Sequence, residues 1–231
     1  GYCAENITIP TGVTKIDDNA FSNCYSLKTI LIPNSVKTIG WSAFYYCKFL
    51  ETIKLPDSLE RIEDDTFYKC ESLETITLPG KLKTIGWSAF LGCKSLKTIT
   101  LPDSLKTIGK SAFRECTSLK TILIPKTLMV KTIEMRTFYE CESLNEIILP
   151  DSVKTIDRGA FKQCTSLNNI TLPDLLEDIE QSAFEGCTSL KTITLPKSLK
   201  TIGESTFEGC TSLESITLPK SLKTIGESTF R

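Results

Sequence analysis

The chain has 231 residues, 40% of them apolar and 24% charged, which is enough of both for a packed core under a solvated surface. The 27 Lys and Arg residues nearly balance the 28 Asp and Glu residues, which argues against the basic surplus of a nucleic-acid-binding protein. The absence of histidine excludes the Ser-His-Asp and Cys-His catalytic arrangements and removes the commonest metal ligand. No apolar run approaches the roughly 20 residues of a transmembrane helix.

The sequence repeats itself with a period of 23 residues. Three columns keep the same register, and in each of them one step is 25 residues long because two residues are added between Pro125 and Lys131. The columns are Phe at 21, 44, 67, 90, 113, 138, 161, 184, 207 and 230, Cys three residues after each Phe up to 210, and Pro at 10, 33, 56, 79, 102, 125, 150, 173, 196 and 219. Such a period predicts a solenoid of about ten stacked coils.

Each coil begins with a predicted strand, represented by residues 96–101. This segment has the L-x-x-L-x-L form of the strand that lines the concave face of leucine-rich repeats. Its aliphatic side chains point inward, whereas Thr98 and Thr100 point to solvent. Pro102 ends the strand because it has no backbone N–H, and a second short extended segment is expected over residues 105–108.

A short helical turn is predicted next, over residues 111–116. Eight coils carry at its start a residue that can cap a helix: Asn19, Ser42, Asp65, Ser88, Ser111, Ser182, Ser205 and Ser228. Gly159 is tolerable at this position and Arg136 is the exception. The Phe and Cys of each coil, three residues apart, are expected on one face of this turn, where they fill the core.

The Cys column has three interpretations. The simplest is a ladder of buried thiols. Adjacent rungs lie within Cα reach of a disulfide, but stacked side chains point the same way and would have to rotate. A line of sulfur atoms does not form the tetrahedron that zinc prefers, so we expect neither a metal nor another cofactor. Cys3 lies outside the column, and we expect it to be free or to pair with a residue upstream of Gly1.

The pattern resembles the BspA-like, or Treponema-type, family of leucine-rich repeats. Residues 85–109 spell it as IGWSAFLGCKSLKTITLPDSLKTIG, and near-copies fill the chain. The expected fold is an α/β repeat solenoid, a curved stack with a concave parallel β-sheet and with short strands and helical turns on its other faces. The resemblance implies a cell-surface or secreted protein of a microbe. We expect residues 1–231 to form one domain and, because both ends fall within a repeat, to be a fragment of a longer protein.

The concave face is the first candidate binding surface, because curved solenoids commonly bind partners there. Its candidate residues are Thr52, Lys54, Thr75, Thr77, Lys97, Thr98, Thr100, Lys191, Thr192 and Thr194. The alternative is that Thr and Lys simply suit a solvent-facing strand. Regular Thr-Ile-Thr triplets also raise the hypothesis of ice binding, against which Lys54, Leu123 and Ile148 interrupt the array.

Two other surfaces are candidates. An aromatic patch in the early coils comprises Trp41, Tyr45, Tyr46, Tyr68 and Trp87, and it either contacts a partner or covers the core. A lysine column comprises Lys37, Lys83, Lys106, Lys131, Lys154, Lys200 and Lys223 and is broken by Glu60 and Glu177. It either grips an acidic glycan or is a solvated edge that discourages aggregation.

We therefore expect a non-catalytic module that binds a protein or glycan, in an adhesin whose partner belongs to the host extracellular matrix or to another cell. The alternative is an internal scaffold or spacer for protein assembly. An enzyme is not expected, because the carboxylate pairs Asp17–Asp18 and Asp64–Asp65 are placed on coil exteriors without an enclosing pocket. Nucleic acid is not an expected partner.

Overall fold

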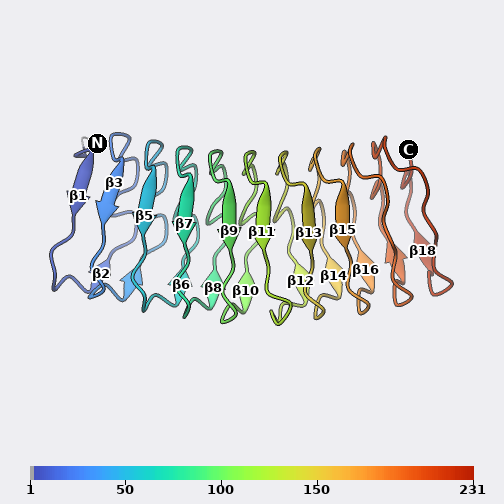
Figure 1. Ribbon diagram of the computed structural model, residues 1–231, viewed down its shortest axis with the longest axis horizontal. Coiled ribbons are helices and arrows are strands. Elements are labelled where there is room, and N and C mark those ends of the chain that lie inside the picture. The colour runs from blue at the N-terminus through green and yellow to red at the C-terminus, as the bar shows by residue number, and fades with distance from the viewer. Residues whose placement is uncertain (1–2) are drawn as a thin grey trace.

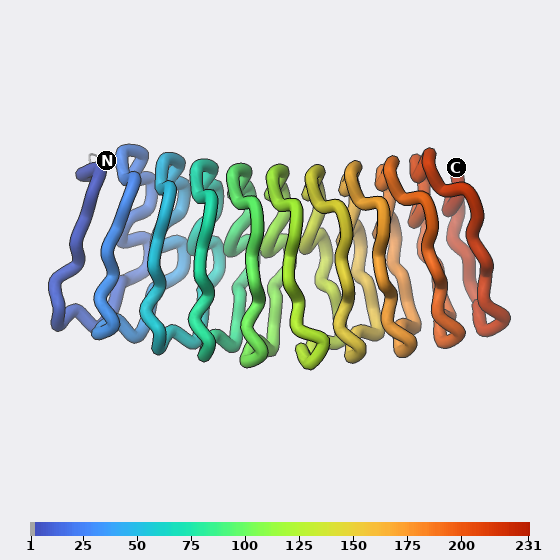
Figure 2. The backbone as a smooth tube through the Cα atoms, in the orientation of Figure 1, coloured from blue at the N-terminus to red at the C-terminus, as the bar shows by residue number. Residues whose placement is uncertain are grey.

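The computed structural model describes residues 3–231 as a rod of about ten stacked coils (Figure 1). Each coil passes once around the long axis, and successive coils lie side by side in chain order. The two ends of the chain therefore lie at opposite ends of the rod (Figure 2). The predicted parallel solenoid with a 23-residue repeat is confirmed.

Eight coils contribute a three-residue strand to one surface, which we call the front strand face (Figure 1). The middle residue of each strand is an isoleucine that points toward the core, and the flanking residues face solvent, as the period of two requires. These strands are β1 Asn6–Thr8, β3 Thr29–Leu31, β5 Thr52–Lys54, β7 Thr75–Thr77, β9 Thr98–Thr100, β11 Thr121–Leu123, β13 Glu146–Ile148 and β15 Asn169–Thr171.

A second row of strands follows the Pro column, and each strand has two residues, of which the second is an isoleucine. The strands are β2 Lys15–Ile16, β4 Thr38–Ile39, β6 Arg61–Ile62, β8 Thr84–Ile85, β10 Thr107–Ile108, β12 Thr132–Ile133, β14 Thr155–Ile156, β16 Asp178–Ile179, β17 Thr201–Ile202 and β18 Thr224–Ile225. In both rows the pairing is parallel and joins equivalent positions of neighbouring coils, as Ile30 with Ile53 shows.

The core is built around a continuous stack of phenylalanine rings from Phe21 to Phe230. Successive ring centroids lie 5.3 to 5.8 Å apart, and the ring planes are parallel to within 15°. This is the offset stacking that aromatic pairs favour. Phe44, Phe67 and the other inner rings are fully buried, so the Phe column occupies the core as predicted.

Eight cysteines form the predicted ladder of unpaired thiols beside the Phe stack. In every rung the Sγ atom donates a hydrogen bond of 3.1 or 3.2 Å to the carbonyl oxygen of the Phe in the preceding coil, as Cys116 does to Phe90. Burial raises the pKa of the Cys47 thiol to about 12. The thiols therefore keep their protons at neutral pH and can act as donors.

The expectation for Cys3 was wrong. Cys3 forms a disulfide with Cys24, and the two Cα atoms lie 5.3 Å apart. Cys24 is the first member of the Cys column, and Cys3 lies in the preceding coil, two positions along from the equivalent rung. That offset brings the two Cβ atoms within reach, whereas members of the same column lie parallel to one another.

The predicted helical turns were also wrong. Residues 111–116 and their equivalents form consecutive tight turns, and no helix occurs in residues 3–231. The positions interpreted as helix caps all have a φ between 50° and 58°, in the left-handed region, including Arg136 and Gly159. A helix cap needs an extended φ, so these residues are turn residues.

The hydrogen bonds show why a helix does not form. The N–H groups of Ala43 and Tyr45 bond to carbonyls three residues earlier in their own coil. The N–H groups of Ser42, Phe44 and Tyr46, which alternate with them, bond to carbonyls of the next coil. A helix would keep all of these bonds within one coil, whereas the stacked turns use half of them to join neighbours.

Candidate ligand-binding surface

The front strand face is divided by seams, which we define as places where neighbouring front strands are not paired in a ladder. In the described part of the chain the ladder runs through β1-β3-β5-β7, then β9-β11, then β13-β15. Beyond β15, a single bridge between Thr192 and Ser215 joins the front segments of the last two coils. The face therefore combines a continuous sheet in the early coils with a segmented region after them.

A groove lies at each of four seams. The first groove, about 360 Å³, lies between β7 and β9, and the second, about 250 Å³, lies between β11 and β13. The third groove, about 250 Å³, lies between β15 and residues 192–196, and the fourth, about 690 Å³, lies between residues 192–197 and 215–221. The segmented region thus presents a row of concave sites along the rod.

Six of the ten predicted front-face residues line these grooves. Thr75, Thr77, Thr98 and Thr100 surround the first groove, and Thr192 and Thr194 line both the third and the fourth. A threonine hydroxyl both donates and accepts hydrogen bonds. The structure therefore gathers exposed hydroxyl groups around an apolar floor of Ile and Leu side chains.

The remaining four predicted residues lie outside the grooves. Thr52 and Lys54 belong to β5, within the continuous sheet. The Nζ atom of Lys97 lies 2.8 Å from a carboxylate oxygen of Glu74, and both side chains are more than half exposed. Such a pair contributes little stability but neutralises the lysine. Lys191 is exposed and has no ion-pair partner among residues 3–231.

The second groove differs from the others because aliphatic side chains line its rim. Leu123 is 57% exposed and Ile148 is 51% exposed, at the position where the strands that line the first and third grooves carry threonine. This seam adjoins the two-residue insertion, whose Met129 is 75% exposed. The sequence shows the substitutions and the insertion, but a single sequence does not show that they produce an open seam with an apolar rim.

The tyrosines of the aromatic patch form a half-buried cluster. The rings of Tyr45 and Tyr68 stack with centroids 4.7 Å apart, and Tyr46 lies against Tyr45 at 6.0 Å. The Nζ atom of Lys69 lies 5.5 Å from the centre of the Tyr46 ring and 5.6 Å from that of Tyr68. Burial raises the pKa of Tyr45. This part of the patch covers the turns and packs largely on itself.

The two tryptophans are arranged differently. Trp87 is 60% exposed, and its backbone N–H donates a 2.7 Å hydrogen bond to the carboxylate of Asp64 in the preceding coil. Trp41 is also exposed and bonds in the same way to Asp18. One carboxylate of each pair noted in the sequence, Asp18 or Asp64, therefore holds the backbone of a turn. Both indole rings are exposed, and the Nζ atom of Lys110 lies 5.9 Å from the centre of the Trp87 ring.

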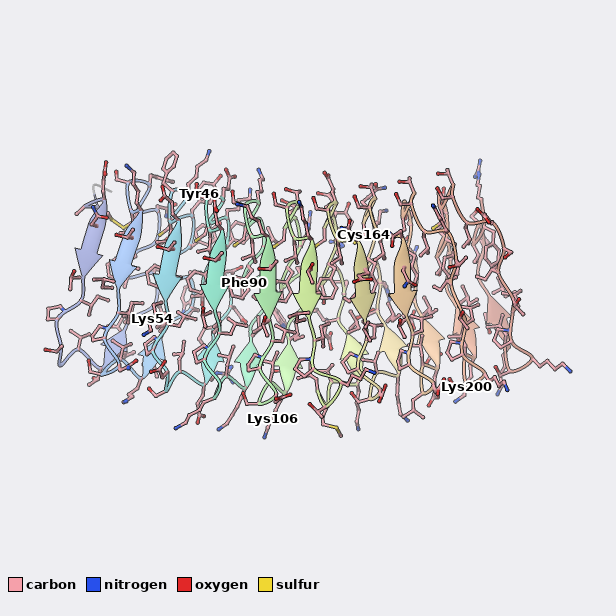
Figure 3. All side chains as sticks on the ribbon, viewed as in Figure 1. Tyr46, Lys54, Phe90, Lys106, Cys164 and Lys200 are labelled. Atoms are coloured by element: carbon pink, nitrogen blue, oxygen red, sulfur yellow. A yellow bond between two sulfur atoms is a disulfide. The ribbon has the colours of Figure 1, made fainter. Side chains whose placement is uncertain are left out.

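The lysine column is partly neutralised by the glutamates that break it. The Nζ atom of Lys83 lies 2.7 Å from Glu60, and Glu177 pairs with both Lys154 and Lys200. These bonds lower the pKa of Glu60 and of Glu177. Figure 3 places Lys106 and Lys200 at the edge of the rod opposite Tyr46. The column is thus mixed in charge, and Lys106, Lys131 and Lys223 have no ion-pair partner among the described residues.

The repeat matches the model of the BspA type leucine rich repeat region over residues 2–120 and 131–231, in six copies. The chain belongs to the BspA-type leucine-rich repeat family. The gap between the two matched ranges coincides with the two-residue insertion. No curated protein is significantly similar to the chain in sequence.

Solved structures of bacterial leucine-rich repeat proteins have the same fold. A leucine-rich repeat protein from Bacteroides ovatus is 28% identical with a TM-score of 0.65, and the match covers 96% of this chain and 82% of that one. The T. pallidum leucine-rich repeat protein TpLRR is 32% identical with a TM-score of 0.60, covering 81% and 78%. The pneumococcal vaccine antigen PcpA is 28% identical with a TM-score of 0.65, covering 96% and 68%.

Two further observations bear on the chemistry of this BspA-type chain. Residues 3–231 contain no group of three or more Cys, Asp or Glu side chains placed to hold a metal ion. The same residues include no helix with the length and apolarity needed to cross a bilayer.

Proposed function

We propose that this chain is a non-catalytic binding module of a cell-surface or secreted adhesin, which contacts a glycan or a protein of the host matrix or of another cell. The observation that carries the proposal is the row of hydroxyl-lined grooves along one face of a rigid repeat core. The likeness to the pneumococcal vaccine antigen PcpA supports exposure to a host.

The composition of the grooves favours binding over catalysis. The first groove is lined by Thr, Ile, Leu and Pro, none of which titrates near neutral pH. The eight thiols of the ladder are unsuitable as nucleophiles, because burial raises their pKa and reaction requires the thiolate. The first groove thus offers hydrogen bonds and apolar contact, and no titratable side chain lines it.

The repeat supports binding along an extended ligand. Several weak sites on one rigid body act together when the ligand spans them, because the second contact forms at a high effective concentration. At roughly 4.8 Å per coil, the first three grooves lie on the order of 10 Å apart, and the third and fourth, which share Thr192 and Thr194, on the order of 5 Å apart. A polysaccharide or an elongated matrix protein matches that spacing better than a small molecule does.

The test is binding of the purified chain to an array of matrix proteins, mucins and glycosaminoglycans, followed by a groove variant. Thr98→Val with Thr100→Val removes two hydroxyls from the first groove while keeping side-chain volume. We expect about a fivefold to tenfold loss of affinity for the ligand found, the effect of about two hydrogen bonds. The matched control is Thr52→Val, in the continuous sheet, which should bind as the original chain does.

Two results would contradict the proposal. If the chain shows saturable binding to none of the host components, the adhesin function is rejected. Equal losses in the groove variant and in Thr52→Val would show that the grooves are not where the ligand binds.

The second candidate function is an internal scaffold or spacer. It is favoured by the aliphatic rim of the second groove, since exposed Leu123, Ile148 and Met129 side chains are typical of protein contacts. Antibody labelling of intact against permeabilised cells separates the two candidates. Labelling of intact cells supports the adhesin, and labelling only after permeabilisation supports the scaffold.

A further inference from the structure

The fourth groove is the largest of those on the front strand face. Its volume is about 690 Å³, against about 360 Å³ for the first groove. The bridge between Thr192 and Ser215 and the adjacent hydrogen bond from the Glu214 N–H to the Lys191 carbonyl join the two coils at one end of the groove. Residues 192–197 and 215–221 form its walls, and they are not paired in a ladder.

Its lining alternates hydroxyl groups with apolar surface. Thr192, Thr194, Ser215 and Thr217 are exposed and line the groove, and Leu195 and Leu218 supply apolar surface between them. Sugars present the same alternation, with hydroxyls around the ring and C–H groups on its faces. Fixed hydroxyls beside apolar surface therefore suit a sugar ring better than a purely apolar ligand.

The charge of the groove separates it from its neighbours. Lys197 and Lys220 line it, and no Asp or Glu does. By contrast, Glu146 lines the second groove and Asp174 lines the third. Neither Lys197 nor Lys220 forms an ion pair within residues 3–231, although the nearby Lys200 is paired with Glu177. Both ammonium groups are exposed and therefore available to an anion.

One wall of the groove is tied to the body of the solenoid. The hydroxyl of Ser221 donates a 2.7 Å hydrogen bond to the carbonyl oxygen of Leu199 in the preceding coil. This bond fixes the backbone next to Lys220, so that part of the site is organised before a ligand arrives.

We propose that the fourth groove binds an acidic saccharide, with the sugar hydroxyls on Thr194 and Thr217 and the anionic group between Lys197 and Lys220. The anion is a carboxylate or a sulfate, since both accept hydrogen bonds from ammonium groups. This inference rests on the proposed binding function and names the class of ligand for one of its sites.

The test is calorimetric titration of the whole chain with three tetrasaccharides: heparin-derived, which carries sulfate and carboxylate, hyaluronan-derived, which carries carboxylate alone, and chitotetraose, which is neutral. We expect an acidic tetrasaccharide to bind at least about tenfold more tightly than chitotetraose. Binding of both acidic probes would assign a carboxylate, and binding of the heparin fragment alone would assign a sulfate.

Variants then locate the site. Lys197→Gln with Lys220→Gln should weaken acidic binding by about tenfold or more. Lys106→Gln with Lys131→Gln removes the same charge from the lysine column, outside the groove, and should change affinity less than about twofold, since exposed charges at a distance are screened. Thr217→Val should weaken binding without altering charge, whereas Thr52→Val should not. Circular dichroism before and after heating confirms that each variant is folded.

The outcomes distinguish this inference from the function beneath it. If both lysine double variants lose affinity equally, the fourth groove is not the binding site, and binding reflects a general attraction to positive charge. If the chain binds matrix proteins but none of the tetrasaccharides, the saccharide proposal is wrong and the adhesin function stands. Loss of binding to every probe and to the matrix array would overturn both.

Discussion

The buried cysteines show how one residue type serves the whole stack. Each thiol fills a small space beside the Phe column and donates a hydrogen bond to a backbone carbonyl of the preceding coil, as Cys93 does to Phe67 at 3.2 Å. Serine would offer a similar donor but is less often fully buried, and alanine would offer none. Burial raises the pKa of Cys93, Cys116 and their equivalents.

This leads to a prediction about alkaline pH. An unfolded thiol loses its proton near pH 9.0, whereas the folded Cys47 thiol keeps its proton to about pH 12. Between these values the folded chain binds more protons than the unfolded chain, so stability falls as pH rises, by about 1.4 kcal/mol per pH unit for each thiol. Urea unfolding at a series of pH values, under reducing conditions, measures the slope.

The matched variant is Cys93→Ala with Cys116→Ala. It should be less stable at neutral pH because two hydrogen bonds and some packing are lost. Above pH 9 its free energy of unfolding should fall less steeply with pH, because about two fewer protons are released on unfolding. An unchanged slope would mean that the ladder is not the group that titrates.

At the scale of the element, the turn restricts which residues can pack against each other in adjacent coils. Gly86 is buried directly beside Asp64 of the preceding coil, and a Cβ atom there would collide with the Asp64 backbone and carboxylate. The same carboxylate holds the N–H of Trp87. A glycine in one coil is therefore coupled to an aspartate in the coil before it.

We predict that Gly86→Ala destabilises the chain by about 1 to 3 kcal/mol, because the added methyl group overpacks a rigid contact. The control is Gly80→Ala, where a Cβ atom would have no neighbour within 4 Å. That variant should be neutral or slightly stabilising, since alanine restricts the unfolded chain. Urea midpoints of the two variants provide the comparison, and equal values would mean that the turn can relax.

Ligand binding should also depend on how the strands are arranged. The seams place Thr75, Thr77, Thr98 and Thr100 around one groove, and they leave Thr52 in a closed ladder. Both sets read alike in the sequence. Their expected difference in binding therefore depends on how neighbouring strands pair, which no single coil specifies.

At the scale of the whole molecule, stability is a sum over neighbouring coils. Phe113 is fully buried and stacks between Phe90 and Phe138. Phe230 is 47% exposed and stacks on Phe207. In a solenoid each interface contributes separately, so the same substitution has different consequences at different places along the rod.

We predict that Phe113→Ala costs about 3 to 5 kcal/mol and Phe230→Ala less than half of that. Because long repeat arrays need not unfold in one step, the measurement is hydrogen exchange resolved by coil together with urea unfolding. Phe113→Ala should accelerate exchange in the coils on both sides of residue 113, and Phe230→Ala only near residue 230. Uniform acceleration by both would indicate one cooperative unit.

The repeat by itself determined the solenoid, the parallel register, the inward Phe and Cys columns and the family, because each depends on a periodicity written in every coil. The turns at Ser111 and its equivalents were misjudged, since hydrogen bonds to the next coil override a local helical pattern. The Cys3–Cys24 disulfide and the seams depend on how different coils meet. Only the tertiary structure decided these features, because each depends on a contact between particular coils that the other coils do not repeat.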